Sequence, residues 1–231
     1  MFFGIDLTYI YLVLPAVLFA LWAQFNVQST FSKYSKVRSR SGMTGYDSAR
    51  RILDANGLHN VGIARVSGKL TDHYNPKDNT IYLSDSVYGE TTAAAIGVAA
   101  HEAGHAVQHA VGYTPMKVRS AIIPITQIGS NLAMPLFLLG IILSYPTLAM
   151  IGVIAFGAST LFQLVTLPVE FNASSRAMDA LRGYNLDSDD LQSARRVLTA
   201  AALTYVAALA VSLANFLRLF LIASRMRGRR D

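Results

Sequence analysis

Long apolar stretches alternate with polar segments along this chain of 231 residues. A hydrocarbon core about 30 Å thick needs about 20 helical residues, and four stretches meet that length. The first is near the N-terminus, and the others follow at 121–144, 147–167 and 197–217. The first span is Phe3 to Trp22 or Gly4 to Phe25. A signal peptide would begin with a basic segment, whereas this N-terminus has Asp6 and no Lys or Arg, so we expect an uncleaved anchor.

The second and third stretches predict a helical hairpin. Tyr145-Pro146 forms the turn between them, and no charged residue occurs from Ser120 to Val169. The hairpin brings Arg119 and Glu170 out on the same side of the membrane. Pro168 is expected to mark a kink or boundary where the second arm leaves the bilayer.

The polar segment before the hairpin reads as a small α+β domain. A helix is expected from the Thr44 N-cap to the Asn56-Gly57 stop signal. Turn-forming residues then separate three short strand-like runs, and an alanine-rich helix follows. The runs are Val61–Val66, Leu70–Tyr74 and Thr80–Ser84, and the helix is 90–111.

After the hairpin, Gly183 is expected to stop a helix, and Ser188-Asp189-Asp190 to begin the next. The fold class is therefore mainly α integral membrane protein, with about four transmembrane helices and a small α+β domain. The expected organisation is an anchor (1–28), a polar domain (29–119), the hairpin (120–169), a returning segment (170–196), and a last transmembrane helix with a basic tail (197–231).

Composition supports a membrane protein. Hydrophobic residues make up 52% of the chain, charged residues only 15%, and the mean hydropathy is +0.36. Soluble domains average about 25% charged residues, and disorder requires low hydrophobicity. The absence of cysteine excludes disulfides, thiolate metal ligands and a cysteine nucleophile.

The net charge of +6 is interpreted as an orientation signal rather than as a sign of nucleic-acid binding. Eleven Lys and Arg residues lie between Asn26 and Arg119, and four more between Arg176 and Arg196. Both segments should therefore face the cytoplasm. If the fourth helix crosses the membrane completely, the arginines of the C-terminal tail lie on the outer side, contrary to this preference of basic residues for the cytoplasm.

The alanine-rich helix contains His101-Glu102-Ala103-Gly104-His105, an H-E-x-x-H motif. Residues four apart share a helix face, so both imidazoles can bind one metal ion. Glu102 can reach a water molecule on that metal and act as general base. Zinc is the expected ion, because catalytic zinc takes three protein ligands and leaves one position for water.

The third ligand must come from elsewhere, and Glu90 and Glu170 are the other glutamates in the chain. Glu90 lies about three turns before His101, in the position of a helix-start acid. Glu170 is preferred as the metal ligand, because the hairpin returns it to the surface where the motif lies. His109 is interpreted as a residue that lines the site rather than as a ligand.

Further residues are candidates for supporting roles. Ser174 shares the helical face of Glu170 and could hydrogen-bond a ligand, or face solvent. The strand at Thr80–Ser84 could pair with an extended substrate, or serve only within the sheet. The candidates for stabilising an oxyanion are His73, Tyr74, Asn172 and Arg176.

The HEAGH motif, the hairpin and the segment LPVEFNASSRA together resemble the YugP type of "putative neutral zinc metallopeptidase", a bacterial membrane family. The similarity extends over nearly the whole chain and includes the DHYNP and TIYLS segments. More distantly, the chain is similar to HtpX-type proteases and CAAX-prenyl endopeptidases, which carry an E-x-x-x-D pattern. This chain has Ser174 at the position of that aspartate.

The resemblance implies a zincin-like (gluzincin) catalytic domain with His101, His105 and Glu170 as zinc ligands and Glu102 as catalytic base. It implies one Zn²⁺ per chain and a multi-pass location in the bacterial cytoplasmic (inner) membrane. The expected function is a membrane-embedded zinc-dependent endopeptidase of membrane or membrane-proximal proteins. The expected partners are therefore the lipid bilayer and a protein or peptide substrate, with no nucleic acid.

A second interpretation is a non-enzymatic membrane scaffold or regulator that retains the protease fold. The intact Glu102 argues against it, since such a protein has no need of the base. A metal transporter is a weaker alternative, because the spans carry almost no ionisable residue. Self-association or a regulatory membrane partner is compatible with each interpretation.

Overall fold

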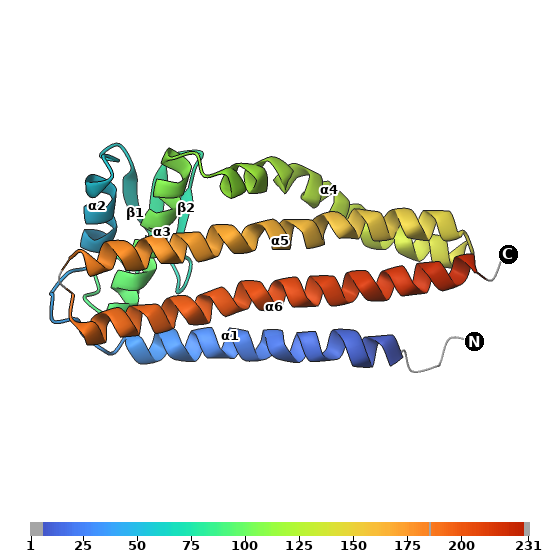
Figure 1. The fold of residues 1–231 in the computed structure, drawn as a ribbon, viewed down its shortest axis with the longest axis horizontal. Coiled ribbons are helices and arrows are strands. Elements are labelled where there is room, and N and C mark those ends of the chain that lie inside the picture. The colour runs from blue at the N-terminus through green and yellow to red at the C-terminus, as the bar shows by residue number, and fades with distance from the viewer. Residues whose placement is uncertain (1–6, 185, 229–231) are drawn as a thin grey trace. The chain divides into compact units, whose positions relative to one another are not determined.

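The computed structural model describes residues 7–184 and 186–228. Its elements, in order, are η1 (Tyr9–Val13), α1 (Leu14–Tyr34), α2 (Gly45–Ala55), β1 (Gly62–Val66), β2 (His73–Asn75), β3 (Thr80–Ser84), α3 (Ala93–Ala110), α4 (Thr114–Ile142), α5 (Pro146–Arg182) and α6 (Ser188–Arg227). Figure 1 labels these elements. The predicted start of the first span at Phe3 or Gly4, and the last tail arginines, lie outside the described residues.

The described chain forms two compact units. The helical unit contains described residues 7–23, 118–167 and 204–228. The mixed unit contains residues 24–117 and 168–203, apart from residue 185. Helices α1, α4, α5 and α6 each contribute residues to both units.

The described chain has four helices that are long and apolar enough to cross a membrane: Tyr9–Tyr34, Thr114–Ile142, Pro146–Arg182 and Ser188–Arg227. Each of the four predicted spans corresponds to one of these helices. The turn of the hairpin lies at residues 143–145, and Pro146 is already the first residue of α5. The helical unit exposes large apolar side chains, among them Leu18, Ile125, Ile154 and Leu213. Exposed apolar surface of this extent is typical of helices surrounded by lipid.

Small residues bring the helices of this unit together. A side chain at Gly152 would collide with the backbone of Phe137, and one at Gly140 with the backbone of Ala149. Between α5 and α6, the hydroxyls of Thr160 and Ser212 are hydrogen-bonded at 2.9 Å. Small residues and interhelical hydroxyl bonds are the usual means of association within a bilayer, where apolar surface alone supplies little driving force.

The mixed unit has a conventional buried core around a three-stranded sheet. The strand order is β1-β3-β2, with β1 parallel and β2 antiparallel to β3. The core includes Leu53 of α2, Ile81 and Leu83 of β3, Ile96 of α3 and Leu181 of α5, each of which is fully buried. The alternation of Ile81 and Leu83 was the sequence signal for this half-buried strand.

The central position of β3 changes one prediction. Along Thr80–Tyr82 both edges of β3 are paired within the sheet, so this part of β3 has no free edge for an extended substrate. The predicted second strand also begins late, because β2 covers only His73–Asn75 and the preceding residues 70–72 form a connection. Leu70 has a φ of 56°, which is incompatible with a regular strand.

Two predicted helix boundaries also differ. The alanine-rich helix α3 begins at Ala93, because Thr92 caps it through a hydrogen bond from the Ala95 amide, so Glu90 lies before the helix rather than in its first turn. The predicted kink or boundary at Pro168 does not end the helix, since α5 continues to Arg182, but Pro168 coincides with the division between the two units. Gly183 and Ser188 mark the end of α5 and the start of α6, as predicted.

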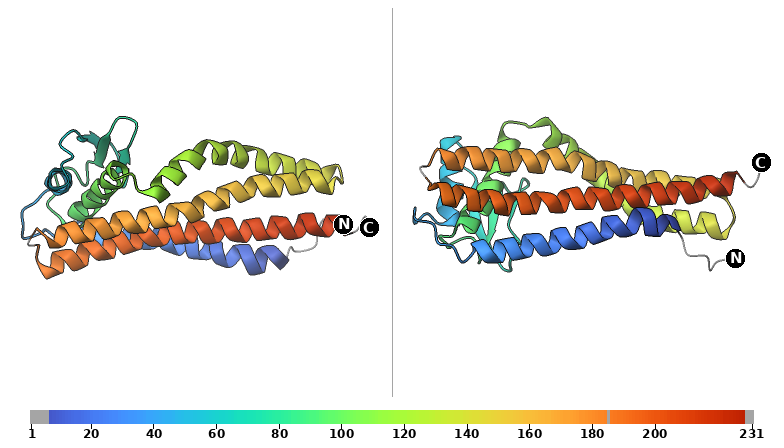
Figure 2. Two further views of the ribbon diagram at one scale, coloured as in Figure 1. Left: turned by 45° about the horizontal axis from the view of Figure 1, so that its top comes forward. Right: turned by 60° about the horizontal axis from the view of Figure 1, so that its bottom comes forward.

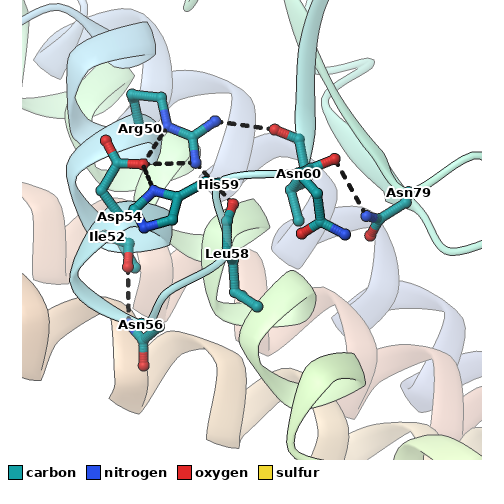
Figure 3. A network of polar contacts seen from close by, with 9 residues as sticks. Arg50, Ile52, Asp54, Asn56, Leu58, His59, Asn60 and Asn79 are labelled. Atoms are coloured by element: carbon teal, nitrogen blue, oxygen red, sulfur yellow. Dashed lines mark hydrogen bonds and ion pairs between the residues drawn. The ribbon is translucent and has the colours of Figure 1, made fainter.

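Helix α2 and the connection to β1 are fixed by local polar contacts (Figure 3). The Arg50 guanidinium donates to the carbonyls of Leu58 and Val61 at 2.8 and 2.9 Å. It also pairs with Asp54, which hydrogen-bonds His59 at 3.0 Å. This arrangement ties the end of α2 to the first strand and so sets the sheet against the helix.

Candidate metal centre

Helix α3 places the two histidines of the H-E-x-x-H motif one turn apart. His105 is buried and His101 is partly buried, and their rings meet edge to face with centroids 4.6 Å apart. Alanine and glycine occupy most of the remaining positions of α3. Their small side chains let other elements approach the helix closely, which brings a third ligand within reach.

The close approach is made by α5. A Cβ at Gly104 would lie 2.7 Å from the carbonyl oxygen of Ala173, so the backbones of the two helices are in contact there. This contact positions Glu170, one turn earlier on α5, beside both imidazoles. Its Oε2 lies 3.3 Å from Nε2 of His101 and 3.4 Å from Nε2 of His105.

These three residues fit a zinc ion. Their donor atoms all lie within 4.8 Å of one another. For tetrahedral zinc with bonds of about 2.0–2.1 Å, neighbouring ligand atoms are about 3.4 Å apart, which matches the two distances from Glu170. Two imidazoles and one carboxylate are also a set found in catalytic zinc sites that keep an open position for water.

A fully buried glutamine orients His105. The Nε2 of Gln108 lies 2.8 Å from the carbonyl oxygen of Val169 and 3.0 Å from Oδ1 of Asn172. Both of those atoms can only accept, so this end of the amide is the donor and the other end, Oε1, is an acceptor. Oε1 lies 3.0 Å from Nδ1 of His105. His105 therefore carries its proton on Nδ1, which leaves the Nε2 lone pair directed toward Glu170 and free to bind metal.

His101 has a hydroxyl partner instead. Its Nδ1 lies 3.1 Å from Oγ of Ser174, on the same face of α5 as Glu170. A histidine that ligates through Nε2 donates from Nδ1, so the serine oxygen acts as the acceptor. The two ring partners thus come from different helices, Gln108 from α3 and Ser174 from α5.

The carboxylate of Glu102 is also buried. Burial alone would lower the pKa of the neighbouring His105, but the carboxylates of Glu170 and Glu102 outweigh it and raise this pKa overall. On the loop before β2, burial raises the pKa of Asp72, and the charge of Glu102 adds to the effect. Asp72 accepts hydrogen bonds from the amide and hydroxyl of Ser84 at 2.7 and 3.0 Å, which joins this loop to the end of β3.

Three other residues considered from the sequence lie outside the ligand cluster and are exposed. His109 is exposed and hydrogen-bonds the hydroxyl of Tyr74 at 2.8 Å, outside the ligand cluster. His73 is exposed on β2, where its ring stacks on Tyr82. Glu90 is exposed as well.

Asn172 and Arg176, two of the oxyanion candidates, are held together. The Nε of Arg176 donates to Oδ1 of Asn172 at 2.8 Å, and Gln108 donates to the same oxygen. A continuous set of hydrogen bonds therefore runs from His105 through Gln108 and Asn172 to Arg176.

Sequence reasoning did not single out Gln108 or Asp72. A signal for Gln108 was present, because a glutamine three residues after a ligand histidine, in an alanine-rich helix, lies on the same face as that ligand. Asp72 had no comparable signal, since its partner Ser84 is twelve residues away and is found only once the sheet is formed.

These features define a class of protein: a mainly helical chain with four described helices long and apolar enough to cross a membrane, and a candidate His-His-Glu metal centre that joins the H-E-x-x-H helix α3 to α5. Comparison with known proteins agrees. The family model described as "Putative neutral zinc metallopeptidase" matches residues 9–224. The "Putative membrane protease YugP" of Bacillus subtilis (strain 168) is 47% identical over 216 residues, which cover 93% of this chain and 96% of that protein.

The chain therefore belongs to this zinc metallopeptidase family. No solved structure matches it.

Proposed function

We propose that this protein is a membrane-embedded zinc-dependent endopeptidase that cleaves membrane or membrane-proximal proteins. The observation that carries the proposal is the convergence of His101, His105 and Glu170 on one point, with the buried Glu102 carboxylate in the same motif. His101, His105 and Glu170 would hold the ion. When bound, zinc would act as a Lewis acid that polarises the scissile carbonyl and acidifies the attacking water.

The chain's own residues would perform the proton transfers. Glu102 accepts the proton of the attacking water and then delivers it to the leaving amine. Gln108 and Ser174 keep the two imidazoles in the tautomer that this chemistry needs.

Substrate pairing is better assigned to β2 than to β3. In the sheet order β1-β3-β2, β2 is an edge strand. It is joined to α3 through the Tyr74–His109 hydrogen bond, one turn beyond His105. The other edge strand, β1, packs on α2. An extended peptide added to β2 would therefore lie beside α3, the helix that carries the H-E-x-x-H motif.

Zinc content and hydrolysis test the proposal together. Purified wild type should contain about one zinc per chain. Glu102→Gln should keep the metal and lose peptide hydrolysis, whereas Glu170→Ala should lose the metal. Glu90→Gln, at the exposed glutamate, is the matched control and should behave as wild type. A Glu102→Gln protein that still hydrolyses peptides would overturn the assignment of the base.

The natural substrates can be sought by comparing the proteomes of cells that carry wild type or Glu102→Gln. Proteins that accumulate uncleaved only with the inactive form are candidate substrates. If no peptide is cleaved and the protein instead copurifies with one membrane partner at fixed stoichiometry, the scaffold or regulator interpretation would replace the protease.

We also propose that residues 29–119 and 170–196 face the cytoplasm from the bacterial inner membrane, as the distribution of Lys and Arg favours. Because the chain has no cysteine, single cysteines can be introduced for labelling. A membrane-impermeant maleimide should label Tyr145→Cys, in the hairpin turn, in intact spheroplasts. It should label Lys77→Cys, between β2 and β3, only after permeabilisation. The opposite labelling pattern would reverse the orientation.

A further inference from the structure

An open cavity of about 440 Å³, lined mainly by polar and charged residues, lies in the mixed unit between the end of α1 and the beginning of α6. Figure 1 and the right-hand view of Figure 2 show these helix segments side by side. From α1 the lining residues are spaced along one helical face, as are those from α6. They are Asn26, Thr30, Lys33, Tyr34, Gln192, Arg195, Arg196, Thr199, Ala200 and Leu203.

The cavity concentrates positive charge. Lys33, Arg195 and Arg196 line it, and no Asp or Glu is among its described lining residues. Asp179 lies along a neighbouring groove that Arg195 also lines. That carboxylate is bound by Arg182 at 2.6 Å, so Asp179 does not neutralise the charge of Arg195.

Tyr34 holds two of the three cations in place. The Arg196 guanidinium donates to its hydroxyl at 3.3 Å, and the Lys33 ammonium lies 5.4 Å from the centre of its ring. Tyr34 itself is buried. Two cations supported by one buried aromatic ring, with hydroxyl and amide groups around them, form a surface complementary to a phosphate, whose oxygens accept several charge-assisted hydrogen bonds.

The position of the cavity along α1 and α6 indicates what kind of phosphate compound it binds. The apolar run of the first span ends at Phe25, and the first lining residue is Asn26; on α6 the lining runs from Gln192 into the apolar stretch at Leu203. The cavity thus lies where both helices change from apolar to polar sequence, at the level of lipid headgroups.

We propose that this cavity binds the phosphate of an anionic phospholipid. Lys33, Arg195 and Arg196 contact the phosphate oxygens, the polar side chains receive the rest of the headgroup, and the acyl chains follow the apolar surfaces of α1 and α6. A volume of about 440 Å³ falls within the range of small-molecule sites. The site is independent of the proposed hydrolysis, since none of its residues belongs to the metal centre.

The test uses the delipidated full chain in detergent and counts bound lipid by native mass spectrometry. Dioleoyl phosphatidylglycerol should bind saturably and about tenfold or more tightly than dioleoyl phosphatidylcholine. K33Q/R195Q/R196Q should abolish this preference. K36Q/R38Q/K77Q removes the same charge from exposed positions outside the cavity and should preserve it. R195Q alone, at an exposed side chain, should weaken phosphatidylglycerol binding severalfold with an unchanged thermal midpoint in the absence of lipid.

The proposed site would be overturned if both triple variants lost the preference for phosphatidylglycerol equally, or if wild type showed no such preference. A third arm replaces the lipid with glycerol 3-phosphate. If this soluble phosphate binds as tightly and depends on the same three residues, the cavity is a site for a free phosphate compound and the lipid assignment is overturned. Zinc content, measured in parallel, should be the same in all variants.

Discussion

Gln108 accepts a hydrogen bond from His105 on its own helix and donates one to the backbone of Val169 on α5. One fully buried glutamine therefore connects the two helices that carry the candidate metal ligands. Its acceptor end sets the tautomer of His105, and its donor end holds the turn of α5 from which Glu170 projects. The two functions can be separated by substitution.

Gln108→Ala removes both contacts and should weaken zinc binding by about 10- to 100-fold, the usual range for partners of metal ligands. Gln108→Glu keeps an acceptor for His105 but loses the donor to Val169, so its zinc affinity should lie between those of Gln108→Ala and wild type. Competition with a chelator measures the affinity. Gln24→Ala, at an exposed glutamine, is the control. An Ala variant with wild-type zinc affinity would show that Gln108 serves packing alone.

Gly104 should be intolerant of even one methyl group. A Cβ there would lie 2.7 Å from the Ala173 carbonyl oxygen, and backbone atoms cannot yield as a flexible side chain can. Gly104→Ala should therefore push α5 from α3, separate Glu170 from the histidines, and reduce zinc affinity by about tenfold, with a stability cost of about 1–3 kcal/mol.

The control for this variant is on the same helix. At Gly97 a Cβ would lie 3.1 Å from the side chain of Ala194, on α6 rather than α5. Gly97→Ala should lower the thermal midpoint but leave zinc affinity near wild type, because α6 carries no ligand. Equal losses of zinc affinity in both variants would indicate general destabilisation instead of displacement of Glu170.

Ser174 and Ser175 form a natural matched pair. Ser174 hydrogen-bonds His101, whereas Ser175 is exposed. Ser174→Ala should lower zinc affinity severalfold, and Ser175→Ala should not. Ser174→Asp places a carboxylate beside Nδ1 of His101 and should bind zinc at least as tightly as wild type, because a charged acceptor holds the ring more strongly. Weaker zinc binding by Ser174→Asp would contradict this role for position 174.

The sequence was sufficient for the parts of the fold that depend on local pattern. The four spans follow from length and hydrophobicity, and the proximity of Glu170 to the histidines was expected because an uncharged hairpin must return its ends to one side. The exact strand β3 followed from the alternation of Ile81 and Leu83. Each of these inferences uses neighbouring residues or a single long-range constraint.

What the sequence did not predict depends on pairing between distant segments. Nothing local indicates that β1 and β2 flank β3, so β3 was considered for substrate pairing although both of its edges are paired along Thr80–Tyr82. Pro168 suggested a kink or boundary, and it lies at the division between the units, yet α5 continues through it, because a proline removes only one helical hydrogen bond and long apolar helices tolerate that loss. The link from Gln108 to Val169 depends on the contact of α3 with α5, which Gly104 permits.

Lowering the pH should destabilise the N-terminal cap of α2, because the carboxylate of Asp47 becomes protonated. Thr44 donates to Asp47 from its amide and hydroxyl, at 3.0 and 2.6 Å, and these bonds hold the pKa of Asp47 below its ordinary value. A depressed pKa in the folded state means that the stabilisation is fully present above the ordinary pKa of about 3.9. It is then lost as the pH falls through the lower, folded-state value.

Asp47→Asn should therefore lower the thermal midpoint in detergent by a few degrees at pH 7, consistent with about 1 kcal/mol for a cap. The difference from wild type should shrink progressively below pH 4. Asp85→Asn, at an exposed carboxylate, should cause no change at either pH, and a constant Asp47→Asn deficit from pH 7 to pH 3 would show that charge at Asp47 is not what stabilises the cap.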